Sequence, residues 1–290
     1  AFVLLAVVSG AAYISVLFGA SGTAQRLLIA RAQRVVESEV AAVRSRLDPV
    51  TTQLELVAAL IASGRIDIES PVAVREAMAV MMSKVPGVSA VAFATLDLQL
   101  HRAVRHLDGL VVRDTVSLVD FPQGMERFRK LQTSHSTFWG ELFWSEQIGQ
   151  PLLNVRTPVR RIDDAFIGGL VATVAVGDLS YLISEAGQSG SNYFILVDRD
   201  KVLAHRRLVD PRGLNLTEEH PLPSIREVGD PVLAAIYDTR VPSPQIDHAL
   251  GPLGHVVEVD GKRWMFVYLT LTGYGPEPWR VSVRRSEEHT

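Results

Sequence analysis

The sequence contains no cysteine. Disulfides, thiol nucleophiles and cysteine-based zinc sites are therefore excluded. The eight histidines include no pair at the His-Glu-x-x-His spacing of zinc proteases, and no Gly-x-Ser-x-Gly nucleophile motif occurs. We therefore expect neither a metal nor another cofactor, and the chain offers no recognisable catalytic set.

The chain also lacks an excess of positive charge. Its formal net charge is −3, so no basic field predicts a nucleic-acid partner. The apolar fraction of 47% and the charged fraction of 21% are typical of globular proteins rather than disordered ones. A length of 290 residues allows one or two domains with a sizeable core.

The first residues are free of charge. Ala1 to Phe18 contains only apolar and small residues, and the uncharged stretch continues to Ala24. About 20 apolar residues span a bilayer, so residues 1–23 are predicted to form a transmembrane helix. A buried core helix and a cleaved signal peptide are the alternatives. Arg26, Arg31 and Arg34 would favour a cytoplasmic location for the following part, but large domains translocate largely regardless of such charges.

A heptad pattern follows, and residues 24–64 are predicted to form a long stalk helix. Its apolar positions alternate in steps of four and three: Val36, Val40, Val43, Leu47, Val50, Leu54, Val57 and Ile61. Pro49 should kink this helix and Gly64 should end it. The seam fits two interpretations, a helix packed on its own domain or a helix that pairs with a second copy of the chain.

Downstream, the pattern changes to short strands between turns. Residues 152–161 and 166–176 read as a hairpin with Asp163 and Asp164 at its tip, and Asp260-Gly261 predicts a second tight turn. A helix, a strand hairpin, an irregular middle and closing antiparallel strands occur twice. We therefore predict an α+β fold with two antiparallel-sheet modules, residues 65–177 and 178–285. Residues 286–290 are expected to begin a link to a second span.

Several stretches resemble a known family. They are VPGVSAVAFAT from Val85, FWGELFWSEQIGQPLLNVRTPV from Phe138, GGLVATVAVGDLSYLI from Gly168 and FILVDRDKVLAH from Phe194. With the long helix before them, they resemble the double Cache sensor domains, which are PAS-like, of bacterial transmembrane receptors. The stretch LPSIREVGDPVLAAI from Leu222 resembles the members fused to class III adenylate or guanylate cyclases.

The resemblance implies that the membrane-distal module, residues 65–177, binds a small ligand. In amino-acid-binding members an Arg and aromatic residues meet the carboxylate, and a late Asp, here Asp178, meets the amine. The Arg-x-Trp-Tyr element of those members is missing, and the comparable stretch of this chain carries Arg127 and Phe128 instead.

The residues themselves also indicate a pocket. Aromatic side chains crowd one short stretch, and Asn154 and Arg156 share one face if they lie on a strand. An Arg suits a carboxylate because its planar fork donates two bonds. The alternative is that the tryptophans belong to the core and that the Arg is solvated or ion-paired. The candidate ligand-binding residues are Trp139, Glu141, Phe143, Trp144, Asn154, Arg156 and Asp178.

The sequence therefore favours an extracytoplasmic sensor over an enzyme. We expect it in a bacterial inner membrane with most of the chain periplasmic, paired as a homodimer through the stalk, and binding a carboxylate or an amine. The cytoplasmic output, a cyclase first, would lie outside the chain. A membrane-anchored periplasmic enzyme and a ligand-free interaction module remain as alternatives, and the latter predicts a distal module without a cavity.

Overall fold

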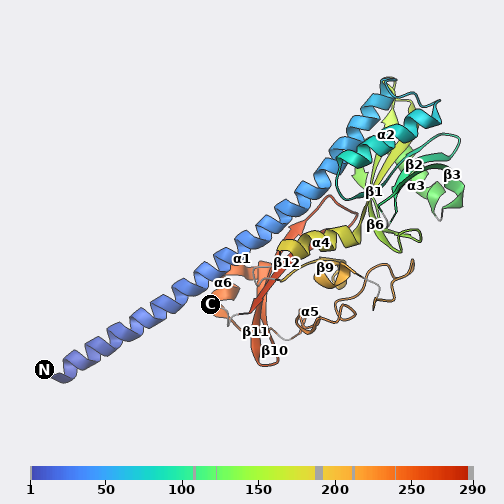
Figure 1. The fold of residues 1–290 in the computed structure, drawn as a ribbon. Helices are drawn as coiled ribbons and strands as arrows, with labels where there is room; N and C mark the ends of the chain where they lie inside the picture. The colour runs from blue at the N-terminus through green and yellow to red at the C-terminus, as the bar shows by residue number, and fades with distance from the viewer. Residues whose placement is uncertain are drawn as a thin grey trace.

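The chain begins with one long helix, α1 (Phe2–Ala62), which Figure 1 shows as a continuous rod. The computed structural model describes residues 2–106, 109–121, 123–186, 192–210, 213–238 and 240–286, without the side chains of residues 2–26, 28, 186, 244, 245 and 247. The transmembrane helix predicted over residues 1–23 lies outside the described side chains. Within the described part, no helix is long and apolar enough to cross a membrane.

The end of α1 is set by Gly64, as predicted. Gly64 adopts a left-handed conformation with φ of 72°. Its N–H donates to the carbonyl of Ile61, and the N–H of Arg65 donates to the carbonyl of Leu60, both over 2.9 Å. These two bonds form a Schellman motif and satisfy carbonyls that the last helical turn leaves open. α1 continues unbroken through the exposed Pro49, so this proline does not end the helix (Figure 1).

The heptad seam of α1 packs on the chain's own modules. Val36, Val43, Leu47, Val50 and Leu54 are fully buried, each with 0% exposure. They contact strands of both sheets described below, so α1 forms part of the core of both modules. The first interpretation of the seam, a helix packed on its own domain, therefore holds over this stretch. Pairing with a second copy would need the opposite, polar face of α1.

The first module, called the distal module because it lies farther from the N-terminal end of α1, contains a mixed set of helices and a seven-stranded antiparallel sheet. Its elements are α2 (Pro71–Lys84), β1 (Val88–Ala94), β2 (Gln99–Arg105), β3 (Val111–Ser117), α3 (Gly124–Thr133), β4 (Phe138–Trp139), β5 (Phe143–Ser145), β6 (Gln150–Arg160) and β7 (Phe166–Ala175). The strand order is β3-β2-β1-β7-β6-β4, and β5 also pairs with β6. The predicted hairpin of β6 and β7 is confirmed, with Asp164 at a positive φ of 64° in its turn.

The second module, called the proximal module, repeats this arrangement with five strands in the order β10-β11-β12-β8-β9. Its elements are α4 (Val176–Ala186), β8 (Asn192–Val197), β9 (Lys201–His205), α5 (Pro231–Ala234), α6 (Pro244–Leu250), β10 (Gly254–Val259), β11 (Lys262–Leu271) and β12 (Trp279–Ser286). In both sheets the module's first strand lies between its second and its last. The α+β class with two antiparallel sheets is therefore confirmed.

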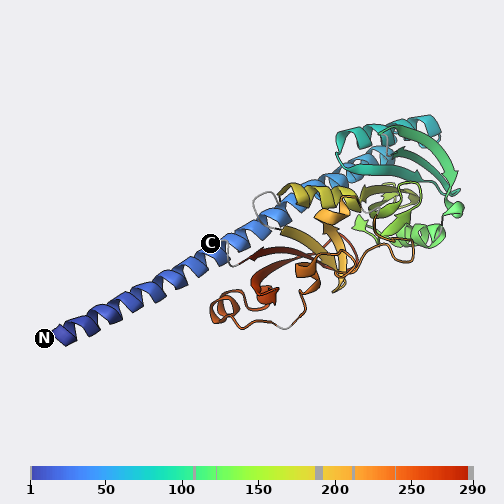
Figure 2. The ribbon, with the colours of Figure 1, turned by 60° about the horizontal axis from the view of Figure 1, so that its bottom comes forward.

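Helices separate the two faces of the distal sheet. α1 and α2 pack on one face, where Val91, Phe93 and Val155 are completely buried. α3 packs against β6 and β7 beside the other face. Figure 2 shows the two modules following one another along α1, with the distal module at its C-terminal end and the proximal module nearer to the N-terminal end. The second face of the distal sheet is left open between α3 and the strand β5.

Candidate functional site

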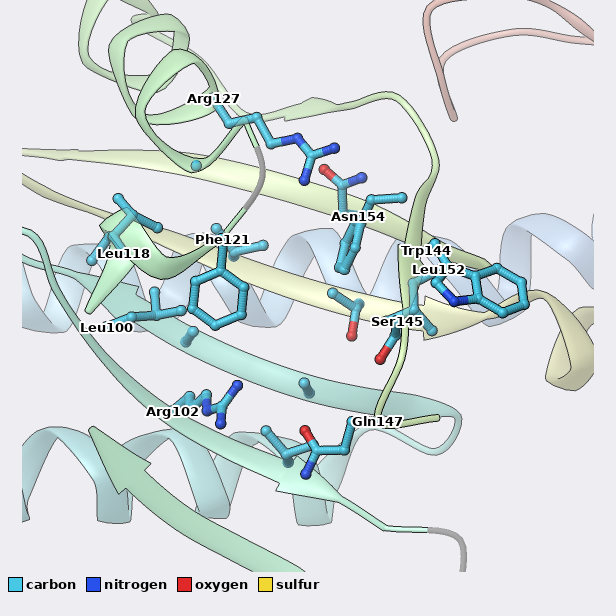
Figure 3. A pocket seen from close by; sticks show the side chains of 18 of the residues that line it. Leu100, Arg102, Leu118, Phe121, Arg127, Trp144, Ser145, Gln147, Leu152 and Asn154 are labelled. Atoms are coloured by element: carbon cyan, nitrogen blue, oxygen red, sulfur yellow. The ribbon is translucent and has the colours of Figure 1, made fainter. Parts of the chain in front are cut away.

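The open face of the distal sheet forms the floor of a cavity of about 560 Å³. Its floor comes from β1, β2, β6 and β7, and its walls from α3, β5 and the residues beside them (Figure 3). This volume lies in the range of small-molecule sites. The second cavity of the described chain, at the module junction, measures only about 10 Å³ and is too small for a metabolite.

Small side chains on β1 make room for the cavity. Ala90, Ala92 and Ala94 line it, whereas the alternating Val91 and Phe93 point into the core under α1 and α2. The period of two along a strand explains this division. One face of β1 therefore carries large side chains that fill the core, and the other face carries alanines that leave room for the cavity.

Two polar atoms on the floor lack a partner. Asn154 on β6 lies directly opposite Thr173 on β7 in the sheet register. The Oδ1 of Asn154 and the Oγ1 of Thr173 are buried and make no hydrogen bond within the described chain. Asn154 is held in place by its Nδ2, which donates to the backbone carbonyl of Glu141. Buried polar atoms without partners are costly, so a bound ligand or water would stabilise them.

Arg156 is the buried cation of the site. It lines the cavity with only 5% of its surface exposed, and no carboxylate of the described residues lies within ion-pair distance. Burial, together with the smaller effect of the nearby charge of Arg127, lowers the pKa of its guanidinium to about 10, against the opposing charge of Glu141. The Arg156 Cζ lies 6.0 Å from the ring centroid of Phe138. A buried cation without a counter-charge is energetically costly, and an anion within hydrogen-bonding reach would offset that cost.

Arg127 provides a second cation from the wall. Figure 3 shows its head group directed from α3 toward Asn154. It donates to the Gln123 side chain over 3.0 Å and lies 5.3 Å from the Phe143 ring centroid. Burial lowers the pKa of Arg127, with partial compensation from Glu141 and Glu218.

Arg102, by contrast, already has a carboxylate partner. It lies on the floor and makes two bonds to Asp114 on the neighbouring strand, of 2.6 and 2.8 Å. This bidentate pair neutralises the cation at the β2 side of the cavity. The unneutralised positive charge is therefore concentrated at Arg127 and Arg156.

The cavity brings together part of the candidate set. Phe143, Trp144, Asn154 and Arg156 line it. Trp139 lies on the other side of β4, where its Nε1 donates to Thr51 of α1 over 3.2 Å. Strand alternation explains the difference, since Phe138 and Trp139 must point to opposite faces.

Glu141 and Asp178 also lie outside the lining. The Glu141 carboxylate points to the exposed Lys130, 3.9 Å away, although its charge acts on both Arg127 and Arg156. Asp178 sits in the first turn of α4. Burial raises the pKa of Asp178, and the charges of Arg46 and Arg105 oppose that rise.

Sequence reasoning missed several lining residues. Arg102 and Glu218 belong to no recognisable motif. Arg102 reaches the cavity through the pairing of strands in the sheet, and Glu218 reaches it through a contact between the two modules. The alternation of Ala90, Ala92 and Ala94 with larger residues was visible in the sequence and could have marked a strand that faces a cavity.

No family model and no curated protein sequence matches the chain. Solved structures do. The ligand-binding domain of Pseudomonas fluorescens chemoreceptor CtaA in complex with L-leucine aligns with a TM-score of 0.58 at 16% identity, over 91% of this chain and 96% of that one. The sensory domain of Campylobacter jejuni chemoreceptor Tlp3 aligns with a TM-score of 0.61 at 10% identity, over 91% and 95%.

A third structure agrees with these two. The ligand-binding domain of Pseudomonas aeruginosa amino acid chemoreceptor PctB in complex with L-Arg aligns with a TM-score of 0.58 at 13% identity, over 90% of this chain and 96% of that one. All three neighbours are ligand-binding or sensory domains rather than enzymes. At these identities the likeness establishes the fold. The chain therefore has the double Cache fold of bacterial sensor domains.

Proposed function

We propose that this chain is the extracytoplasmic ligand-sensing region of a transmembrane receptor, with its ligand in the cavity of the distal module. The observation that carries the proposal is Arg156, a buried cation on the cavity floor without a carboxylate partner among the described residues. A cavity of about 560 Å³ does not fit the alternative of a ligand-free module, which requires a filled interior.

The ligand class is a small carboxylate. Arg156 and Arg127 would bind its anionic group, because a guanidinium donates two parallel bonds to a carboxylate. The unpartnered atoms of Asn154 and Thr173 would orient it by accepting and donating one hydrogen bond each. Phe143 and Trp144 supply apolar wall for the rest of the molecule.

The signal would leave the cavity through α1. This helix contacts both sheets, and its N-terminal part includes the proposed membrane span, residues 1–23. A ligand that binds one arrangement of the modules more tightly than another would shift their populations. We propose that the chain is periplasmic beyond a bacterial inner-membrane helix, pairs with a second copy through the exposed face of α1, and regulates a cytoplasmic output, a class III cyclase first.

The test is a thermal-shift screen of the 290-residue chain in detergent, followed by its intrinsic tryptophan fluorescence. Short carboxylates, amino acids, amines and purines form the panel. A binder at one hundred times its Kd stabilises the fold by about 2.7 kcal/mol. We expect hits among carboxylates that are lost in Arg156→Gln.

Two variants serve as controls. Arg129→Gln removes an equal charge from the exposed face of α3, and Asp178→Asn changes a carboxylate outside the cavity lining. Both should keep the hits. A panel without any carboxylate hit, or hits that survive Arg156→Gln, would contradict the proposed site.

A further inference from the structure

A loop of the proximal module reaches the cavity of the distal module. It connects β9 to α5, and both ribbon views show it extending away from the proximal sheet toward the distal module (Figure 1 and Figure 2). Leu216, Pro221 and Leu222 line the cavity of only about 10 Å³ together with Gln150 and Pro151 of the distal module. So little free space means that the loop is packed on the distal module rather than hanging free.

The tip of this loop is a closed turn. The N–H of Thr217 donates to the carbonyl of His220 over 3.1 Å, and the N–H of His220 donates back to Thr217 over 3.2 Å. The base of the turn is fixed by Glu227, which accepts bonds from the Ser224 N–H at 2.6 Å and from the His220 ring at 3.1 Å. The two central residues, Glu218 and Glu219, are therefore presented in a defined geometry.

Only one of these two glutamates borders the cavity. Glu218 lines its mouth, whereas Glu219 does not. The charge of Glu218 also acts on Arg127, where it opposes the lowering of the pKa by burial. The cavity thus has cations at Arg156 and Arg127 and exposed carboxylates at Glu218 and Glu146.

This charge order suits a molecule with opposite charges at its two ends. A carboxylate held at Arg156 directs the remainder of the ligand to the mouth, where Glu218 provides an acceptor for a cation. We propose that Glu218, contributed by the proximal module, binds the ammonium group of the ligand and so selects amino-carboxylates over plain carboxylates. This inference rests on the proposed function and adds that the site is completed by both modules.

Such an arrangement would couple binding to the module contact. A ligand bridging Arg156 and Glu218 would hold the loop of residues 213–223 against the distal module. A ligand that binds more tightly because it contacts both Arg156 and Glu218 would favour the arrangement in which the loop is packed on the distal module.

The experiment compares matched pairs of probes on the full chain by isothermal titration calorimetry at low ionic strength, where screening is weak. Each pair is an ω-amino carboxylate, with chains from 3-aminopropanoate to 6-aminohexanoate, and the alkanoate of the same length. We expect at least one ω-amino carboxylate to bind more tightly than its alkanoate. Glu218→Gln should weaken that probe about fivefold, the upper range of an exposed ion pair, and leave the alkanoate unchanged.

Glu219→Gln is the matched control, because it removes the neighbouring charge of the same turn without touching the cavity. If both variants lose the same affinity for the ω-amino carboxylate, the negative charge of the loop as a whole attracts the ammonium group and Glu218 does not bind it directly. That result would overturn the inference. Binding that depends on Arg156 but ignores Glu218→Gln would overturn the inference while leaving the proposed function intact. Failure of every probe to bind the unaltered chain would count against both.

Discussion

The indole ring of Trp139 in the distal module lies 5.6 Å, centroid to centroid, from the ring of Tyr274 in the proximal module. Both residues are also bonded to α1. The Trp139 Nε1 donates to Thr51, and the Tyr274 hydroxyl donates to Asp48. The two modules and the stalk helix therefore meet at one aromatic contact.

This contact shares a two-residue strand with the ligand cavity. On β4, Phe138 lies opposite Arg156 in the register, and Trp139 lies opposite Val155. Any ligand that moves Arg156 would act on the residue next to Trp139. β4 thus connects Arg156, which lines the cavity, to the junction of the modules with α1.

We expect Trp139→Ala to destabilise the protein, since it removes both the ring contact with Tyr274 and the bond to Thr51. The loss should fall below the roughly 3–5 kcal/mol typical of a fully buried aromatic, because Trp139 is only half-buried. Urea denaturation followed by circular dichroism measures it. Trp139→Phe keeps a ring but loses the N–H, and should cost about 1 kcal/mol. An unchanged midpoint in Trp139→Ala would contradict a stabilising junction.

Gly140→Ala should disable the cavity without unfolding the module. A Cβ at Gly140 would lie 2.6 Å from the Asn154 Oδ1 and 3.1 Å from the Arg156 Cζ, so both side chains would have to move. We expect carboxylate hits of the thermal-shift screen to bind at least tenfold more weakly, which corresponds to about 1.4 kcal/mol. Gly275→Ala is the control, because its Cβ would make only an ordinary contact, 3.5 Å from the Trp279 Nε1, and lies outside the cavity lining. Undiminished binding in Gly140→Ala would place the ligand elsewhere.

The sequence predicts local structure well where a local rule decides it. The seam of α1, the glycine that ends this helix and the Asp-Gly hairpin turn each depend on residues within a few positions. Asp260 and Gly261 adopt φ of 53° and 74°, as a two-residue hairpin turn requires. Likewise Asn154 and Arg156 share a face because they lie two apart on a strand.

The sequence does not reveal which residues far apart along the chain contact one another. The buried seam of α1 is evident from its pattern, but its partner, the chain's own sheets, is not. Trp139 and Trp144 look alike in a short aromatic stretch, yet only Trp144 lines the cavity, because β4 turns Trp139 toward Tyr274.

Asp230 forms the charged centre of the proximal module. Its carboxylate caps α5 by accepting the N–H groups of Val232 and Leu233, and it pairs with both terminal nitrogens of Arg284. Burial alone would raise the pKa of Asp230, but bonds from His205 and Arg284 outweigh it and hold this pKa well below its ordinary value. The pair therefore adds stability above pH 4, which is lost as the pH falls below that value.

Asp230→Ala should cost about 3–5 kcal/mol, because it leaves the buried Arg284 without its counter-charge. The double change Asp230→Leu with Arg284→Met should recover most of that loss, since a buried pair can be replaced by apolar residues. The exposed pair of Glu76 and Arg113, 3.4 Å apart, provides the comparison. Glu76→Gln should cost no more than about 1 kcal/mol. Similar urea midpoints for Asp230→Ala and Glu76→Gln would contradict this role.

Glu39 should make stability depend on pH near neutrality. Its side chain is buried in α1 with 5% exposure, and its Oε2 has no hydrogen-bond partner in the described chain. Burial raises the pKa of Glu39 from 4.5 to about 7. Between these values the folded protein binds more protons than the unfolded chain, so stability is complete below pH 4.5 and falls as the pH rises to 7.

The pKa difference of Glu39 between the folded and unfolded states limits the loss of unfolding free energy to about 3 kcal/mol. Glu39→Gln cannot ionise and should lose that pH dependence, so its unfolding free energy should exceed that of the unaltered chain at pH 8 more than at pH 5. Glu37→Gln, on the exposed side of the same helix, should follow the unaltered chain at both pH values. Urea titrations at the two pH values measure the difference. Because the other titrating groups are common to all three proteins, parallel curves for Glu39→Gln and the unaltered chain would show that Glu39 ionises without penalty in the folded state.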